Sequence, residues 1–219
     1  MDLNLQTNHL FPVPVTTAQM PAVDVMDFVK TIKFIPYASG DNSSTTADNC
    51  HLTISQNKQV LDTYPELVEL RKNIVTATEQ YWREVIGVDS TLDLKIMHSW
   101  ITRHLPGQWN RPHVHNSSVI TSTAYLQTAD NCGNLIFNKN PHHLNLFPMM
   151  IELDYAVVNN TNRKSFSITP RDNLIVCFPS HLEHYTEANN SNTERYAINV
   201  DWWFEGLARK NSTGFESIY

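Results

Sequence analysis

The alternation of apolar and polar residues from Leu92 onward constrains the fold of this chain more than any other feature of its sequence. Successive side chains of a strand point to opposite faces, so this alternation is typical of strands that bury one face. Turn-rich pieces such as residues 105–107 and 130–133 separate the alternating segments, which favours an antiparallel sandwich or barrel. The predicted strands are residues 92–103, 118–127, 134–139, 165–169, 173–178 and 194–204.

The N-terminal residues show helical patterns instead. Apolar side chains recur every three or four positions through residues 64–86, and Pro65 suits the first turn of a helix. A second, shorter helix is predicted over residues 24–33 with Asp24 as its cap. The polar residues 39–49 are predicted to form a loop.

Helices followed by many short strands indicate a mainly β protein with N-terminal helices packed on one sheet, and a jelly roll is the expected architecture. The length favours one domain over residues 1–219. We divide it into a helical N-terminal part (1–90), a jelly-roll core (91–205) and a C-terminal tail (206–219).

Composition excludes several classes of function. The formal net charge is −6 and neither half of the chain is basic, which disfavours nucleic-acid binding. There is no apolar stretch long enough for a transmembrane helix and no pattern of a secretory signal. Cys50, Cys132 and Cys177 form no CxxC pair, so a zinc ribbon is excluded and a reduced, cytoplasmic protein is expected.

Histidines carry the functional signal, since seven of the ten lie between His104 and His184. His113 and His115 are two positions apart, and on an extended backbone they point to the same face about 7 Å apart. Two neutral imidazoles on one face can bind one divalent metal ion. A third ligand is expected after the strand at 173–178, where His181 and His184 lie three positions apart and therefore face opposite ways.

Arg195 follows His184 by eleven positions, inside an alternating segment. A buried arginine is costly unless it meets an anion, whereas an arginine on the solvated face would pair with Glu183 or Glu187. The order of HxH, a later histidine and then an arginine fits one chemistry well. Three side chains hold iron(II), and the arginine binds the far carboxylate of a 2-oxo acid.

From Leu10 to about Asp201 the chain resembles the 2-oxoglutarate/Fe(II)-dependent oxygenases, most closely a small prolyl-hydroxylase-like group of bacteria and tailed phages. The resemblance implies a double-stranded β-helix that uses Fe(II), 2-oxoglutarate and O2. The matching pieces are LFPVPV (10–15), Ser99-Trp100, HVHNSS (113–118), Tyr125-Leu126, FPSxLxH (178–184) and Arg195.

The same resemblance implies roles for single residues. His113, His115 and His184 would bind the iron, with His184 preferred over His181. Arg195 and, more loosely, Tyr125 would bind 2-oxoglutarate, and no catalytic residue is implied beyond the metal centre.

The chain departs from the family pattern at three points. Most such enzymes have a carboxylate where this chain has His115, so three imidazoles would leave the iron at +2 instead of +1. Ala197 replaces a serine that commonly contacts the co-substrate. Thr121-Ser122 stands where the group tends to carry a Ser-Gly pair.

The resemblance further implies hydroxylation of an amino-acid side chain in a peptide or protein, with proline first and a free small molecule second. Trp109, in a predicted loop beside the site, is a candidate substrate contact. Three alternatives stay open: a three-histidine cupin enzyme without 2-oxoglutarate, a catalytically inactive homologue, and a non-catalytic jelly-roll binding or virion module. A homodimer is expected from base rates alone, and a phage-encoded protein would work in the host cytoplasm.

Overall fold

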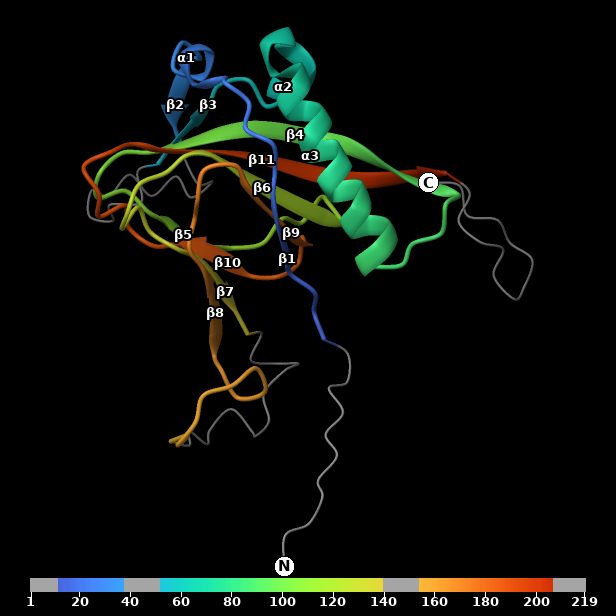
Figure 1. Cartoon of the computed structure of the whole chain (residues 1–219), viewed down its shortest axis with the longest axis vertical. Helices are drawn as coiled ribbons and strands as arrows, with labels where there is room; N and C mark the ends of the chain where they lie inside the picture. Colours follow the sequence, from blue (N-terminus) through green and yellow to red (C-terminus); the bar gives the residue numbers. More distant parts are fainter. Residues whose placement is uncertain (1–11, 38–51, 140–153, 207–219) are drawn as a thin grey trace, which may run out of the picture.

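Two antiparallel sheets lie face to face in the computed structural model, which describes residues 12–37, 52–139 and 154–206 (Figure 1). The larger sheet has the strand order β1 (Thr16–Gln19), β9 (Leu174–Pro179), β6 (Ile120–Gln127), β11 (Arg195–Gly206), β4 (Leu92–His104), β3 (Thr53–Ser55) and β2 (Phe34–Pro36). The smaller sheet has the order β5 (Asn110–His113), β10 (His184–Thr186), β7 (Leu135–Asn138) and β8 (Ser165–Ile168). The predicted fold class, mainly β with helices on one sheet, is confirmed.

The six predicted strands correspond to β4, β6, β7, β8, β9 and β11. Five further strands were not predicted, because β1, β2, β3, β5 and β10 are only three or four residues long and show too few alternations. Three of them lie in the part of the chain that was expected to be helical. The N-terminal part therefore also extends both edges of the larger sheet.

The predicted long helix is confirmed as a continuous run of η1 (Pro65–Leu67), α3 (Val68–Gln80) and η2 (Tyr81–Val85). Gly87, at φ +78°, adopts the left-handed conformation that ends it. The prediction for residues 24–33 was wrong in its length and its cap. Helix α1 (Met26–Val29) follows Val25 without any side-chain cap, and Lys33 already pairs with Gln56 beside β2.

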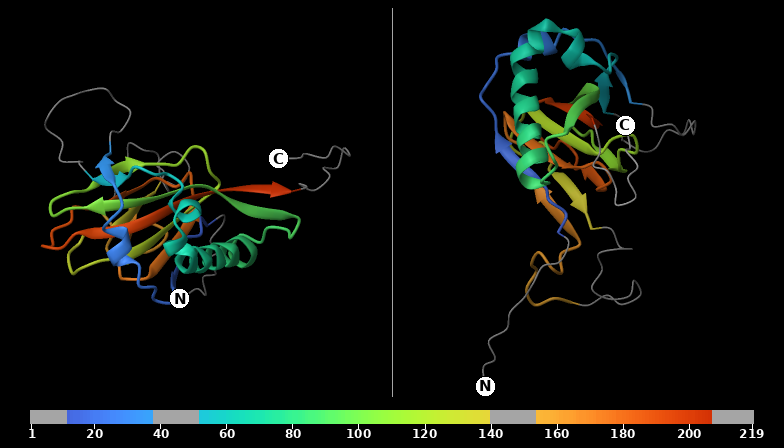
Figure 2. Two further views of the ribbon diagram at one scale, coloured as in Figure 1. Left: turned by 90° about the horizontal axis from the view of Figure 1, so that it is seen from above. Right: turned by 90° about the vertical axis from the view of Figure 1, so that its right-hand side faces the viewer.

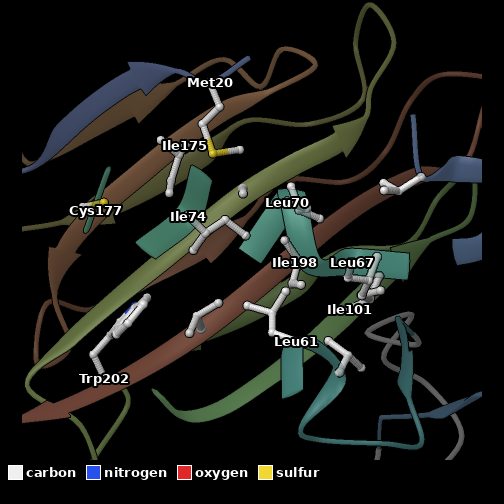
Figure 3. Close-up of a cluster of buried hydrophobic side chains, with 14 of the residues drawn as sticks. Met20, Leu61, Leu67, Leu70, Ile74, Ile101, Ile175, Cys177, Ile198 and Trp202 are labelled. Atoms are coloured by element: carbon white, nitrogen blue, oxygen red, sulfur yellow. The ribbon is translucent and has the colours of Figure 1, made fainter. Parts of the chain in front are cut away.

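Helix α3 covers the outer face of the larger sheet, as Figures 1 and 2 show. Leu70 and Ile74 point from the helix toward the strands, where Ile175, Ile198 and Trp202 lie beneath them (Figure 3). Each of these five side chains is buried. Burying one such side chain contributes about 1.5–3 kcal/mol, so this face supplies most of the hydrophobic stabilisation.

Strand β11 serves two different environments because its side chains alternate between its faces. On the outer face, its residues belong to the core under α3: Tyr196, Ile198, Val200 and Trp202. On the inner face, its residues line a cavity between the two sheets: Arg195, Ala197, Asn199 and Asp201.

A β-bulge interrupts the pairing of β4 with β11. Asp201 pairs with His98, but the next residue, Trp202, pairs with Ile96, so Met97 is the extra residue. Before the bulge, Leu94 and Ile96 pack in the outer core. After it, the even-numbered residues His98, Trp100, Thr102 and His104 line the inner cavity. The bulge thus moves the even-numbered positions of one strand from the core to the cavity.

Helix α2 (Val60–Thr63) and the other helices in the described ranges are too short and too polar to cross a membrane. The predicted loop at residues 39–49 and nearly all of the predicted C-terminal tail lie outside the described residues.

Candidate metal centre

Three imidazole rings meet where β5 and β10 pair. His113 ends β5, His115 follows it by two residues, and His184 opens β10 directly opposite His113. One ring nitrogen of each histidine lies within 4.8 Å of those of the other two. The ring centroids are 4.4–5.3 Å apart. The three rings are therefore close enough to bind a single metal ion.

Hydrogen bonds fix the orientation of each ring. The Nδ1 atom of His113 lies 2.8 Å from the Arg111 carbonyl oxygen, and that of His184 lies 2.9 Å from the Leu182 carbonyl oxygen. The Nδ1 atom of His115 lies 2.6 Å from Oδ1 of Asp201. Carbonyl and carboxylate oxygens only accept, so each Nδ1 donates its hydrogen, and in the neutral form of each ring the lone pair is on Nε2. This is the tautomer in which Nε2 binds a metal ion.

Burial keeps two of these imidazoles neutral. It lowers the pKa of His184 to about 3, with the neighbouring His113 adding to the effect. Burial also lowers the pKa of His113 below its ordinary value. Because a metal ion binds only the neutral imidazole, no proton has to be displaced from either ring at neutral pH. The donor set thus fits a divalent transition metal.

A chain of hydrogen bonds continues outward from His115. Oδ1 of Asp201 also accepts a hydrogen bond from the Thr121 hydroxyl at 3.0 Å. That hydroxyl lies 2.9 Å from the Ser180 hydroxyl, which accepts from Ser118 at 2.8 Å. These contacts hold the Asp201 carboxylate in place behind the imidazole, away from the centre of the triad.

Arg195 is fully buried at the other end of the inner face, with 1% of its surface exposed. Its Nη1 donates to the carbonyl oxygens of Cys132 and Gly133, both at 2.8 Å. Within the described residues, three buried side-chain polar atoms have no hydrogen-bond partner: Arg195 Nε, Tyr125 Oη and His104 Nδ1. Buried polar groups nearly always have partners, so a cluster of three indicates a place for a polar ligand.

The charge states of these groups favour an anionic ligand. Burial raises the pKa of Tyr125 to about 12, so its hydroxyl stays protonated and can donate. Burial and the nearby Arg195 lower the pKa of His104 well below its ordinary value, so its ring is neutral. A buried guanidinium beside a donating hydroxyl and a neutral imidazole is a suitable environment for a carboxylate.

The histidine triad and the Arg195 cluster line one cavity of about 340 Å³ between the sheets. This is the size range of small-molecule sites. A family model described as "Putative 2OG-Fe(II) oxygenase" matches residues 98–201, which contain both groups. Residues 98–201, which carry the whole candidate site, therefore match the 2OG-Fe(II) oxygenase family. Fe(II) and 2-oxoglutarate are the metal and co-substrate of that family.

Solved structures of other oxygenases share the fold. A Pseudomonas putida prolyl-4-hydroxylase is 12% identical, with 89% of this chain and 94% of that chain covered at a TM-score of 0.51. HygX from Streptomyces hygroscopicus, solved with nickel and 2-oxoglutarate bound, is 11% identical, with 94% of this chain and 91% of that chain covered at a TM-score of 0.55.

A third structure is a Trichoplax adhaerens prolyl hydroxylase in complex with a peptide fragment of the hypoxia inducible factor oxygen degradation domain. It is 14% identical, with 82% of this chain and 74% of that chain covered at a TM-score of 0.51. At these identities the likeness is one of fold. A search of curated proteins finds no match.

The structure brings most of the sequence-predicted site residues together. His184 is buried in the triad, whereas His181 is exposed and not part of it. Arg195 lies on the inner face and not on the solvated face. Glu183 and Glu187, its alternative partners, bond instead to the Asn138 side chain and the Asn134 backbone.

Trp109 is half-buried and is not among the residues lining the cavity, so its substrate role stays a prediction. Trp100 lines the cavity and stacks on His115 with ring centroids 5.7 Å apart. His98 is exposed at the cavity wall, because β4 is at its bulge there. The adjacent histidines that follow Pro141 in the sequence, His142 and His143, lie outside the described residues.

Sequence reasoning gave no role to two residues of this site, His104 and Asp201. A signal for both was present. His104 is four positions from Trp100, and Asp201 is six positions from Arg195. Residues an even number of positions apart in a strand share a face, so His104 lies on the same face as Trp100 and Asp201 on the same face as Arg195.

Proposed function

We propose that this chain is an Fe(II)- and 2-oxoglutarate-dependent dioxygenase that hydroxylates an amino-acid side chain, with a prolyl residue as the first candidate. His113, His115 and His184 would bind the iron, and Arg195 with Tyr125 would bind 2-oxoglutarate. The observation that carries the proposal is the presence, in one cavity, of three imidazoles with free Nε2 atoms and a buried arginine with an unpartnered Nε.

The metal role is supported by the hydrogen bonds on the outer side of each ring. Rings whose Nδ1 atoms are already engaged cannot turn away, so the ligand geometry is formed before any ion binds. A histidine triad serving only to pack would not need to bring one ring nitrogen of each histidine within 4.8 Å of the other two.

The co-substrate role is supported by the Arg195 cluster. The guanidinium neutralises the far carboxylate of a 2-oxo diacid, and the Tyr125 hydroxyl donates a further hydrogen bond to it. Both residues act by binding and orienting. When bound, the iron and 2-oxoglutarate together supply the oxidising chemistry, in which O2 and 2-oxoglutarate give succinate, CO2 and a hydroxylated C–H bond.

The substrate class is supported by what similar structures act on. One of them is a prolyl hydroxylase with a peptide bound, and another is a prolyl-4-hydroxylase. The cavity wall of this chain adds Tyr37, Leu52, Ile54 and Trp100, an apolar and aromatic surface that suits a pyrrolidine ring. A free small molecule with a similar apolar portion is the second candidate.

The first test is anaerobic thermal unfolding of metal-loaded protein with and without 2-oxoglutarate. Wild type should gain stability from 2-oxoglutarate only when metal is present, and Arg195→Ala should lose that gain. Arg171→Ala, an exposed arginine in the turn before β9, is the matched control and should behave as wild type.

The same experiment separates the alternatives. Metal binding without a response to 2-oxoglutarate would favour the three-histidine cupin enzyme or an inactive homologue. Absence of stoichiometric metal binding would favour a non-catalytic jelly-roll module. A positive result leads to incubation with proline-containing peptides and matched alanine peptides, where a mass gain of one oxygen atom on the proline peptides alone identifies the substrate class.

A further inference from the structure

We infer that Asp201 is a positioning residue that tunes the metal centre through His115, supplying negative charge that the three imidazole ligands lack. The inference rests on the proposed function, because it concerns the same metal centre. It goes beyond that function by assigning a role to a carboxylate that does not itself bind the ion.

Asp201 differs from the groups behind the other two rings. His113 and His184 each donate to a neutral backbone carbonyl, whereas His115 donates to a carboxylate at the shorter distance of 2.6 Å. An N–H to carboxylate hydrogen bond is shorter and stronger than one between neutral groups. The triad is therefore asymmetric, with one electron-rich imidazole and two ordinary ones.

The charges around the cavity explain why this carboxylate matters. Lys58 and Arg195 line the cavity, and Asp201 is the one acidic residue in its lining across the described part of the chain. A divalent cation held by three neutral imidazoles near two cationic side chains would otherwise meet no fixed negative charge. Asp201 offsets part of that positive charge from directly behind one of the three imidazoles.

The placement of Asp201 is built into the fold. It is buried, with 9% of its surface exposed, and its Oδ1 also accepts from the Thr121 hydroxyl. It lies at the β-bulge, where β11 is still in register with His98. Trp100 stacks on the His115 ring. The imidazole is thus held by a carboxylate at one edge and an indole on one face.

Such outer contacts raise the donor strength of a ligand histidine and fix its tautomer. We therefore expect Asp201 to tighten metal binding and to make the bound iron more electron-rich. A residue with a purely structural role would affect unfolding but would not alter the electronic properties of the metal centre.

The decisive variant is Asp201→Asn, which keeps the size of the side chain and an oxygen that can accept from His115 but removes the charge. Metal affinity, measured by anaerobic titration with Fe(II) and with Mn(II), should fall about 10- to 100-fold. The matched control is Asp172→Asn, which removes a carboxylate that accepts two hydrogen bonds from Thr128 and is not part of the cavity lining. The control should bind metal as wild type does.

A spectroscopic readout separates tuning from support of the fold. The charge-transfer absorption of the anaerobic complex with Fe(II) and 2-oxoglutarate should move to higher energy in Asp201→Asn, because a less electron-rich iron gives up its electron less readily. Unfolding of the metal-free variant should match that of wild type. Unchanged metal affinity and an unchanged absorption band would overturn the inference.

A charge exchange provides the second test. His115→Asp alone places two carboxylates against each other and should bind metal poorly. In the double variant with Asp201→Asn, the single negative charge lies at position 115, which binds the metal, instead of at position 201 behind it. Metal affinity of the double variant should recover above that of either single variant. No recovery in a folded double variant would count against the inference.

Failure of the inference and failure of the proposed function are distinguishable. If wild type binds no metal, the proposed function itself fails. If wild type binds metal and responds to 2-oxoglutarate while Asp201→Asn is indistinguishable from it, only the role of Asp201 is lost.

Discussion

The two faces of the larger sheet are built from the same strands and differ in almost every physical respect. The outer face, under α3, is largely apolar, and the polar atom of its largest side chain, Nε1 of Trp202, donates to the Ser122 hydroxyl at 2.9 Å. The inner face carries the histidines, Arg195 and Asp201, and within the described residues it leaves three buried polar atoms without partners. The outer face is fully packed without a ligand, whereas the inner face has buried polar atoms that a ligand could bind.

The strands of this sheet therefore contribute to stability on one face and to ligand binding on the other. Adjacent residues of β11, such as Ile198 and Asn199, lie a single peptide unit apart yet belong to the two different environments. Substitutions on the outer face should change the free energy of unfolding and leave ligand binding intact. Substitutions on the inner face should do the reverse.

The largest expected effect is on the outer face. Ile198→Ala should lower the free energy of unfolding by about 2–5 kcal/mol, because it opens a cavity under α3, whereas Ile198→Val should cost about 0.5–1.5 kcal/mol. Chemical denaturation measures both. The additional stabilisation by 2-oxoglutarate should be unchanged, and its loss in Ile198→Ala would show that the two faces are coupled.

On the inner face, His184→Ala should abolish the stabilisation that metal confers, about 2.7 kcal/mol at a metal concentration 100 times the dissociation constant. His181→Ala is the matched control, since that side chain is exposed three residues away. Thermal unfolding with and without metal measures the effect. A metal response that survived in His184→Ala but not in His181→Ala would reassign the third ligand.

Arg195→Met should separate binding from stability most clearly. Loss of a charged hydrogen-bond donor should weaken 2-oxoglutarate binding by about 1.5–3 kcal/mol, roughly 10- to 100-fold. The ligand-free protein should unfold within about 1 kcal/mol of wild type, because the variant leaves two carbonyl oxygens unpaired but no longer buries a charge. A large loss of stability without any change in ligand affinity would make Arg195 a structural residue.

The smallest effect concerns pH. Burial holds the pKa of His104 well below its ordinary value of 6.5. As the pH falls through this value, the ring is protonated in the unfolded chain but stays neutral in the folded protein. Stability of the metal-free protein therefore declines as pH falls below about 6.5, with each such histidine contributing up to about 1.4 kcal/mol per pH unit. His104→Gln should flatten this decline by one histidine's share in denaturation series between about pH 5 and 7. An unchanged slope would mean that His104 is protonated in the folded state.

Much of the fold could be predicted from local patterns alone. The long strands β4 and β11 extend over 13 and 12 residues with alternation on both sides of the bulge, and the helix around α3 repeats its apolar positions over several turns. The strands β5 and β10 escaped prediction although they present His113 and His184. They are four and three residues long, too short to show an alternation of apolar and polar residues, so they form strands only because of the strands with which they pair.

The same distinction applies to the candidate site. The unusual residue types, two histidines two apart and an arginine in an apolar strand, were visible in the sequence. The contact of His115 with Asp201 joins residues 86 positions apart, and its existence depends on the register between β-strands. Register is set by tertiary pairing, so this contact could be found only in the folded structure.

The bulge at Met97 has a consequence for how this chain can vary among relatives. Met97 is exposed and its side chain is 38% accessible, so many residues could replace it. Deletion of Met97 would restore regular pairing between β4 and β11. Either Leu94 and Ile96 would then leave the core, or His98 and Trp100 would leave the cavity wall. We therefore expect natural variation at this position to occur by exchange of the residue and almost never by its loss.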